Sequence, residues 1–172
     1  MHYGKINKTD IVNGTGVRVS LFVSGCRRKC PGCFNLEAQD FNYGKEFTND
    51  TVQEIIGYLD NPWTRGLTIL GGEPLEPENL SEVARLVMTT RQKFGIGKTI
   101  WIYSGFCWED LMERSLNDLT LAYILHSIDV LVDGPFVEYY KDITLKFKGS
   151  SNQRIIDVAR SLETGAVVLA EV

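Results

Sequence analysis

The sequence predicts a single α/β domain over residues 1–172, built as a partial, open βα barrel with a mainly parallel sheet. Two observations lead to this prediction. Short runs rich in β-branched and aromatic residues alternate along the chain with amphipathic helical segments, which is the pattern of βα units. About four such units are visible, fewer than the eight that close a barrel, so we expect the sheet to remain open.

The predicted strands are short apolar runs bounded by turn residues, at residues 17–23, 66–70, 99–103 and 128–132. Apolar residues at helical spacing predict helices between them. The first helix has Thr48 as its N-cap and ends at Asn61-Pro62. The others are expected from about Pro77 and over residues 108–114 and 119–126. The segment from residue 154 onward is ambiguous between helix and strand.

Composition excludes several classes of function. With 44% hydrophobic residues, 23% charged residues and a net charge of −4, the chain resembles an ordinary globular protein without a basic stripe for nucleic acid. No apolar run approaches the roughly 18 residues of a membrane helix. The start of the chain lacks a hydrophobic export core. We therefore expect a cytoplasmic protein that binds neither nucleic acid nor membrane.

Three cysteines within eight residues are the strongest chemical signal. Cys26, Cys30 and Cys33 have the spacing C-x3-C-x2-C on a loop that follows the first predicted strand. In a reducing compartment such a cluster favours metal binding over disulfides. Three thiolates on a 4Fe-4S cluster leave one iron open to another ligand. Cys107 lies far along the chain among apolar neighbours, and we interpret it as a semi-buried free thiol outside the cluster.

A basic run separates the first two cysteines. Arg27, Arg28 and Lys29 favour the thiolate form of neighbouring cysteines and offset the negative charge of a thiolate-bound cluster. The alternative is a run of solvated surface charges without a role in the site. Zinc binding is disfavoured because His2 and His126 do not complete a zinc-ligand spacing.

Several motifs, taken in their order along the chain, resemble those of a known family. They are Arg18 with residues 10–16, then residues 21–26, 30–35, 71–75, 130–134 and 149–154. Together they resemble the radical S-adenosyl-L-methionine (SAM) superfamily and, within it, the activating proteins of anaerobic, class III ribonucleoside-triphosphate reductases. The chain departs from these patterns in having Glu73 where relatives often have Asp, and Phe147-Lys148 where Trp-Arg is usual.

The resemblance implies a radical SAM type of partial barrel, a 4Fe-4S cluster on Cys26, Cys30 and Cys33, and SAM on the open iron. It places Gly32, Cys33 and Phe34 near the nucleoside, although the superfamily usually has an aromatic residue at the position of Gly32. It places Gly71, Gly72 and Glu73 near the amino group of SAM, where glycines let a ligand approach the backbone closely. No catalytic side chain is expected beyond the cluster and SAM.

The implied reaction is reductive cleavage of SAM, which generates a glycyl radical on the large catalytic subunit of the reductase. A low-potential electron donor, flavodoxin-like or ferredoxin-like, is the second expected partner. Three alternatives remain open: an activase of another glycyl radical enzyme such as pyruvate formate-lyase, a radical SAM enzyme for a small molecule, and a non-enzymatic iron–sulfur or zinc module using Cys107. The roles of Asp133, Asn152 and Arg154 stay undecided.

Overall fold

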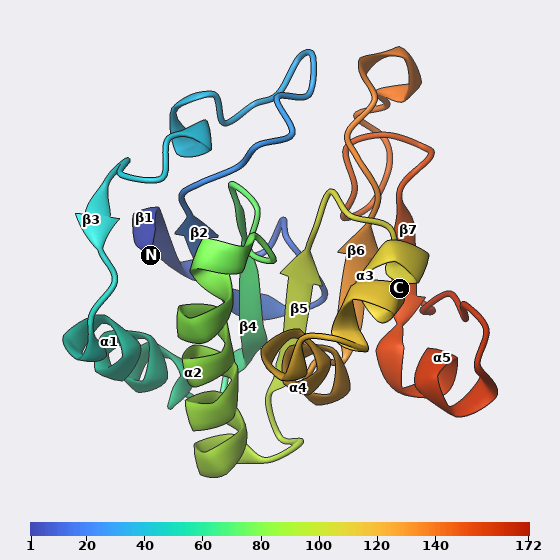
Figure 1. Cartoon of the computed structure of the whole chain (residues 1–172). Coiled ribbons are helices and arrows are strands. Elements are labelled where there is room, and N and C mark those ends of the chain that lie inside the picture. Colours follow the sequence, from blue (N-terminus) through green and yellow to red (C-terminus); the bar gives the residue numbers. More distant parts are fainter.

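The fold is built on one seven-stranded sheet with helices packed against one face (Figure 1). We describe it from a computed structural model that covers residues 1–172. The strands lie in the order β3-β1-β2-β4-β5-β6-β7. Their bounds are β1 His2–Asp10, β2 Val17–Val23, β3 Lys45–Glu46, β4 Thr64–Gly71, β5 Thr99–Tyr103, β6 Val130–Asp133 and β7 Arg154–Asp157.

The sheet is mixed, which corrects the prediction of a mainly parallel one. The four central strands β2, β4, β5 and β6 run parallel to one another. However, β1 is antiparallel to both β2 and β3, and β7 is antiparallel to β6. The α/β class is confirmed, while a partial barrel of radical SAM type stays a prediction. The strands β1 and β3 were missed and β7 was left ambiguous, because these strands lie toward the edges and lack the continuous apolar pattern of buried parallel strands.

The helices follow the predicted positions closely. They are α1 Asn49–Leu59, α2 Pro77–Phe94, α3 Trp108–Ser115, α4 Leu119–Ser127 and α5 Val158–Thr164, with short 3-10 turns η1 Glu37–Gln39 and η2 Glu138–Tyr140. Thr48 is confirmed as the N-cap of α1, because its side chain accepts from the backbone N–H of Thr51 in a capping box. The ambiguous segment from residue 154 contains both β7 and α5.

The main core lies between the sheet and the helices. Alternate residues of the central strands, such as Leu21 in β2, Ile69 in β4 and Ile102 in β5, are fully buried against apolar faces of the helices. The opposite face of the sheet carries a small apolar cluster of Trp101, Val132 and Ile155. Helix packing on one face therefore orients the strands and leaves their carboxyl ends accessible to loops.

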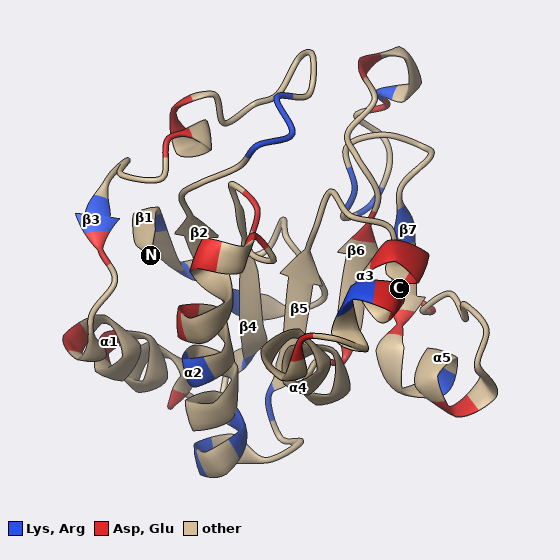
Figure 2. Cartoon of the chain, in the orientation of Figure 1, with Lys and Arg blue, Asp and Glu red and all other residues tan.

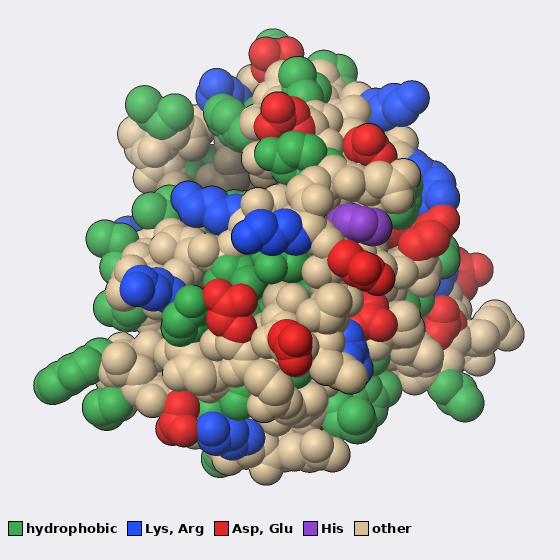
Figure 3. Space-filling model, turned by 90° about the vertical axis from the view of Figure 1, so that its left-hand side faces the viewer, with side chains coloured by type: hydrophobic (Ala, Val, Ile, Leu, Met, Phe, Trp, Pro, Cys, Tyr) green, Lys and Arg blue, Asp and Glu red, His purple; other side chains and the backbone are tan.

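The loops that follow β2, β4, β5 and β6 all leave the sheet at the carboxyl ends of its strands, because these four strands are parallel (Figure 1). Figure 1 shows the loop after β2 and the loop between β6 and β7 rising above this end of the sheet. Viewed from the side of β1, β3 and α1, the surface mixes charges of both signs and is hollowed near the top (Figure 3). No helix has the length and apolar character needed to span a membrane.

Candidate functional site

A pocket of about 230 Å³ lies at the carboxyl ends of the parallel strands. Its walls come from four segments: the loop after β2, the end of β4 and its following turn, the end of β5, and the loop between β6 and β7. Ligand sites in open α/β sheets occupy this position, because the connecting loops there bring together residues distant in the sequence. The pocket is therefore the candidate functional site.

Most of the residues predicted for the site lie in this pocket. Those lining it are Cys26, Cys30, Cys33, Phe34, Gly71, Gly72 and Glu73. Gly32 does not line the pocket, because it faces Glu138 of the β6–β7 loop, whose Cδ is 2.8 Å from where a Cβ would lie. Cys107 is the N-cap residue of α3 and also lies outside the pocket lining.

The three clustered cysteines are free and partly exposed thiols. Burial raises the pKa of Cys26, while the backbone N–H of Arg28 opposes that shift by donating to its sulfur. No group of three or more His, Cys, Asp or Glu side chains converges closely enough to hold a single metal ion. A cubane cluster does not require such convergence, because each thiolate binds a different iron atom.

The cysteine loop is firmly anchored at its beginning. The backbone N–H of Gly25 donates to Ala38 O at 2.8 Å, and that of Cys26 donates to Gln39 O at 3.2 Å. The rest of the loop has one internal backbone bond, from Cys33 N–H to Cys30 O at 3.2 Å. Cys26 is thus held by the body of the protein, whereas Cys30 and Cys33 are held mainly by their own loop.

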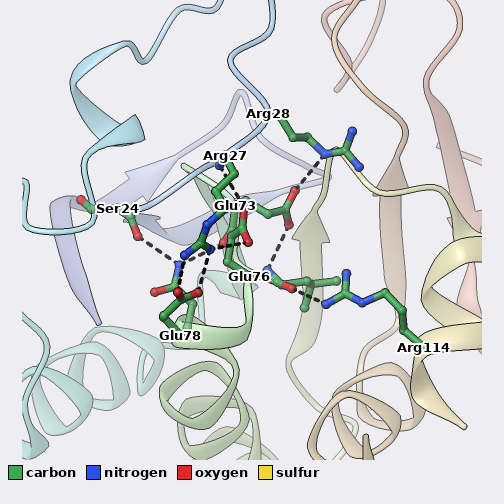
Figure 4. Close-up of polar contacts among 9 residues, drawn as sticks. Ser24, Arg27, Arg28, Glu73, Glu76, Glu78 and Arg114 are labelled. Atoms are coloured by element: carbon green, nitrogen blue, oxygen red, sulfur yellow. Dashed lines mark hydrogen bonds and ion pairs between the residues drawn. The ribbon is translucent and has the colours of Figure 1, made fainter. Parts of the chain in front are cut away.

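The three basic residues of this loop have different surroundings. Arg27 turns toward α2, where its backbone N–H and guanidinium donate to Glu76 and its guanidinium also pairs with Glu78 (Figure 4). Figure 2 shows the basic segment of the cysteine loop above the acidic positions at the start of α2. Lys29 is exposed. Arg28 alone lines the pocket, so one cation of the run belongs to the site and the others belong to the surface.

The turn after β4 packs tightly against the cysteine loop. Gly72 N–H donates to Val23 O at 2.7 Å and Glu73 N–H donates to Gly25 O at 2.8 Å. A Cβ at Gly71 would lie 2.7 Å from Val23 O, and one at Gly72 would lie 2.7 Å from Gly25 O. The two glycines line the pocket, yet the space that their missing side chains provide is taken by the chain's own backbone.

Glu73 is buried and fully engaged by the protein. Its Oε1 accepts from Leu75 N–H at 3.0 Å and from the Ser104 hydroxyl at 2.9 Å, and its Oε2 accepts from Gly105 N–H at 2.7 Å. Burial raises the pKa of Glu73, against the lowering effect of these hydrogen bonds. The carboxylate therefore joins the turn after β4 to the end of β5.

The cysteine loop and the β6–β7 loop meet beside the pocket. The ring centre of Phe34 lies 5.7 Å from that of Phe136, and Lys141 Nζ lies 4.8 Å from the centre of the Phe34 ring. Phe136 and Tyr103 are pocket residues that the sequence analysis missed. The sequence feature that could have indicated them is their place near the carboxyl end of a predicted strand: Tyr103 ends one strand and Phe136 closely follows another.

The polar residues after β6 brace the frame of the site. Asp133 is buried and accepts from Trp108 N–H at 2.7 Å and from Arg154 Nε at 3.0 Å. Asn152 Nδ2 donates to Pro135 O at 2.8 Å. Gln153 lies in the 149–154 motif, whose role the sequence left undecided; it lines the pocket and donates through Nε2 to Gly134 O at 3.0 Å. These contacts tie β6 to β7 and to the loop between them.

Comparison with known proteins gives a consistent result. Residues 12–156 match the model of a family described as a 4Fe-4S single cluster domain. The chain is similar to the anaerobic ribonucleoside-triphosphate reductase-activating protein of Enterobacteria phage T4, at 38% identity over 157 residues, covering 90% of this chain and 93% of that one. It is similar to the proteins of the same name from Escherichia coli K12, at 39% identity with 89% and 96% covered, and Vibrio cholerae, at 37% identity with 90% and 97% covered.

Proposed function

The chain belongs to the family of anaerobic ribonucleoside-triphosphate reductase-activating proteins, and we propose that it activates such a reductase by reductive cleavage of SAM. In this proposal Cys26, Cys30 and Cys33 bind a 4Fe-4S cluster, and SAM binds beside it on the open iron. The outcome is a glycyl radical on the large catalytic subunit. A low-potential flavodoxin-like or ferredoxin-like protein supplies the electron.

One observation carries the proposal. Three free cysteines line a single pocket at the carboxyl ends of the parallel strands, and Cys107 lies outside that lining. Thiolates are the ligands that iron–sulfur clusters use in proteins, so this donor set fits a cluster. The pocket also provides room beside the cysteines, bounded by residues of the three other strand ends.

The cluster, when bound, supplies the single electron that breaks a carbon–sulfur bond of SAM. The residues of the chain bind SAM, orient it beside the cluster and enclose it in the pocket. The anchored start of the cysteine loop holds Cys26 in place, and Phe34 offers an aromatic face beside the pocket. Glu73 accepts three hydrogen bonds that fix its carboxylate between the turn after β4 and the end of β5, so its role in this proposal is to brace the site.

The test is anaerobic reconstitution of the full chain and of four variants, Cys26→Ser, Cys30→Ser, Cys33→Ser and Cys107→Ser. Iron and sulfide content and the yield of 5′-deoxyadenosine from SAM with dithionite are measured for each. We expect the first three variants to lose the cluster and SAM cleavage, and Cys107→Ser to keep both. Loss of iron from Cys107→Ser would mean four-cysteine ligation and would contradict the open-iron assignment.

A second measurement identifies the target. The reconstituted chain, SAM and a reductant are mixed with the large reductase subunit or with pyruvate formate-lyase, and each mixture is examined by electron paramagnetic resonance. We expect a glycyl radical signal on the reductase subunit alone. A signal on pyruvate formate-lyase alone would make the chain an activase of the other class.

A further inference from the structure

The pocket is lined by two charged side chains, and one of them has a buried nitrogen without a hydrogen-bond partner. Among the residues that line the pocket, Arg28 is the only Lys or Arg and Glu73 is the only Asp or Glu. Glu73 already accepts three hydrogen bonds, from Leu75, Ser104 and Gly105. Arg28 Nε is buried without a hydrogen-bond partner. Of these two charged groups, the one with a buried atom that lacks any hydrogen-bond partner is therefore the cation.

Arg28 is held in place by its stem and by an aromatic ring. Its side chain crosses Gly105 so closely that a Cβ there would lie 2.3 Å from Arg28 Cδ. Its guanidinium carbon lies 4.3 Å from the centre of the Phe106 ring. Its Nε lies 3.9 Å from Glu73 Oε2, within ion-pair range but too far for a hydrogen bond. Figure 4 shows the terminal nitrogens of Arg28 directed away from Glu73.

A second guanidinium group lies beside Arg28. Arg114 lies against the same Phe106 ring, with its guanidinium carbon 4.3 Å from the ring centre. One terminal nitrogen of Arg114 donates to Leu75 O at 3.1 Å, and the other is buried without a partner. Arg28 and Arg114 thus pack on the same ring, and each has a buried guanidinium nitrogen without a hydrogen-bond partner. An anionic ligand beside Arg28 would supply the acceptor that its buried Nε lacks within the protein.

We propose that Arg28 is the carboxylate-binding residue of the pocket and donates to the α-carboxylate of the sulfonium amino acid bound there. A guanidinium matches a carboxylate because it presents paired N–H donors in one plane. The alternative, in which the charge of Arg28 acts on the iron–sulfur cluster itself, is one outcome of the test below. This inference rests on the proposed function, because it takes SAM as the occupant of the pocket.

The test combines a substitution of Arg28 with removal of the carboxylate group from the ligand. Equilibrium dialysis under nitrogen measures the dissociation constants of SAM and of decarboxylated SAM for the cluster-loaded wild type, Arg28→Gln and Arg28→Lys. Lys29→Gln is the matched control, because it removes the same charge from an exposed neighbour outside the pocket lining. The ratio of the two constants is taken within one sample, so incomplete cluster loading cancels from it.

We expect Arg28→Gln to weaken SAM binding about 10- to 100-fold, as for a lost charge-assisted hydrogen bond, and to change binding of decarboxylated SAM less than about threefold. Arg28→Lys should recover part of the loss, and Lys29→Gln should leave both constants unchanged. Iron content and thermal unfolding of each variant identify any folding defect.

Three results would overturn the inference. Equal weakening of both ligands would mean that Arg28 shapes the loop rather than binding the carboxylate. Unchanged SAM affinity with a lower cluster midpoint potential in Arg28→Gln than in Lys29→Gln would assign the charge to the cluster. Wild-type protein that loads iron but binds neither ligand would remove the proposed function itself, and this result differs from the other two because it appears without any substitution.

Discussion

At the scale of single residues, Gly72 controls the packing between the two segments that build the pocket. A Cβ at this position would lie 2.7 Å from Gly25 O and 2.8 Å from Ala38 O. Gly25 precedes Cys26 directly, and its N–H donates to Ala38 O. Both atoms are backbone carbonyl oxygens that cannot rotate away as a side chain can. Any side chain at residue 72 must therefore displace the start of the cysteine loop.

We predict that Gly72→Ala lowers the free energy of unfolding by about 1–3 kcal/mol, as overpacking does in other cores, and reduces iron loading at the same time. Gly57→Ala is the control, because Gly57 lies in α1 and a Cβ there meets nothing within 4 Å. That substitution should stabilise the protein by about 0.5–1 kcal/mol through helix propensity. Urea unfolding and iron analysis measure both effects. Full iron loading of Gly72→Ala would show that the loop adapts.

At the scale of elements, Asp133 joins three of them at the end of β6. Its carboxylate accepts from the backbone N–H of Trp108, which begins α3, and from the guanidinium of Arg154, which begins β7. Arg154 also pairs with Glu109 in the first turn of α3. The hydrogen bonds to Asp133 and Glu109 raise the pKa of Arg154, which therefore stays cationic. These contacts hold β7 antiparallel to β6 under the loop that closes one side of the pocket.

We predict that Asp133→Ala lowers the free energy of unfolding by about 2–4 kcal/mol, between the values for an unsatisfied buried donor and for a broken buried ion pair. Glu109→Gln is the comparison, because the Glu109 side chain is 61% exposed and Arg154 keeps Asp133. Its cost should stay below about 1 kcal/mol, as for surface ion pairs. Denaturant unfolding of both variants gives the two values. Similar costs would mean that the buried carboxylate does not organise this junction.

At the scale of the whole molecule, the two ends of the sheet have different tasks. The carboxyl ends of the strands bear the pocket. Near the amino end of β2, the fully buried Arg18 donates to Thr68 Oγ1 at 2.6 Å, to Leu67 O at 2.6 Å and to Thr99 O at 3.0 Å. These bonds link β2, β4 and β5. Burial lowers the pKa of Arg18 to about 10, so the side chain remains charged at neutral pH.

We predict that Arg18→Lys lowers the free energy of unfolding by about 1–3 kcal/mol, because an ammonium group cannot reach the carbonyl groups that the planar guanidinium bridges. Arg18 and Val23 are five residues apart, or about 16 Å along an extended strand, so the start of the cysteine loop should be undisturbed. Thermal unfolding and SAM affinity below the transition measure the two properties. A fall in SAM affinity equal to that of a pocket variant would contradict this separation of tasks.

Sequence alone predicted the elements that depend on neighbouring residues. The strands 17–23 and 99–103 and the Thr48 cap agree with the structure in every bound, because apolar alternation and capping chemistry act over a few positions. The strand β1 was missed, since much of it is polar and it owes its conformation to pairing with β2 and β3. Without β1, and with the segment that contains β7 left ambiguous, the sheet could not be recognised as mixed.

The spacing of the cysteines and the order of the motifs were enough to identify the family of the chain. Both are properties of the sequence and need no tertiary structure. Only the tertiary structure decided which cation faces the pocket. Arg27 and Arg28 are indistinguishable as neighbours in sequence, but Glu76, 49 positions after Arg27, pairs with Arg27 and leaves Arg28 to line the site. The physical reason is that ion pairs form between groups close in space, and the folding of α2 against the cysteine loop sets that distance.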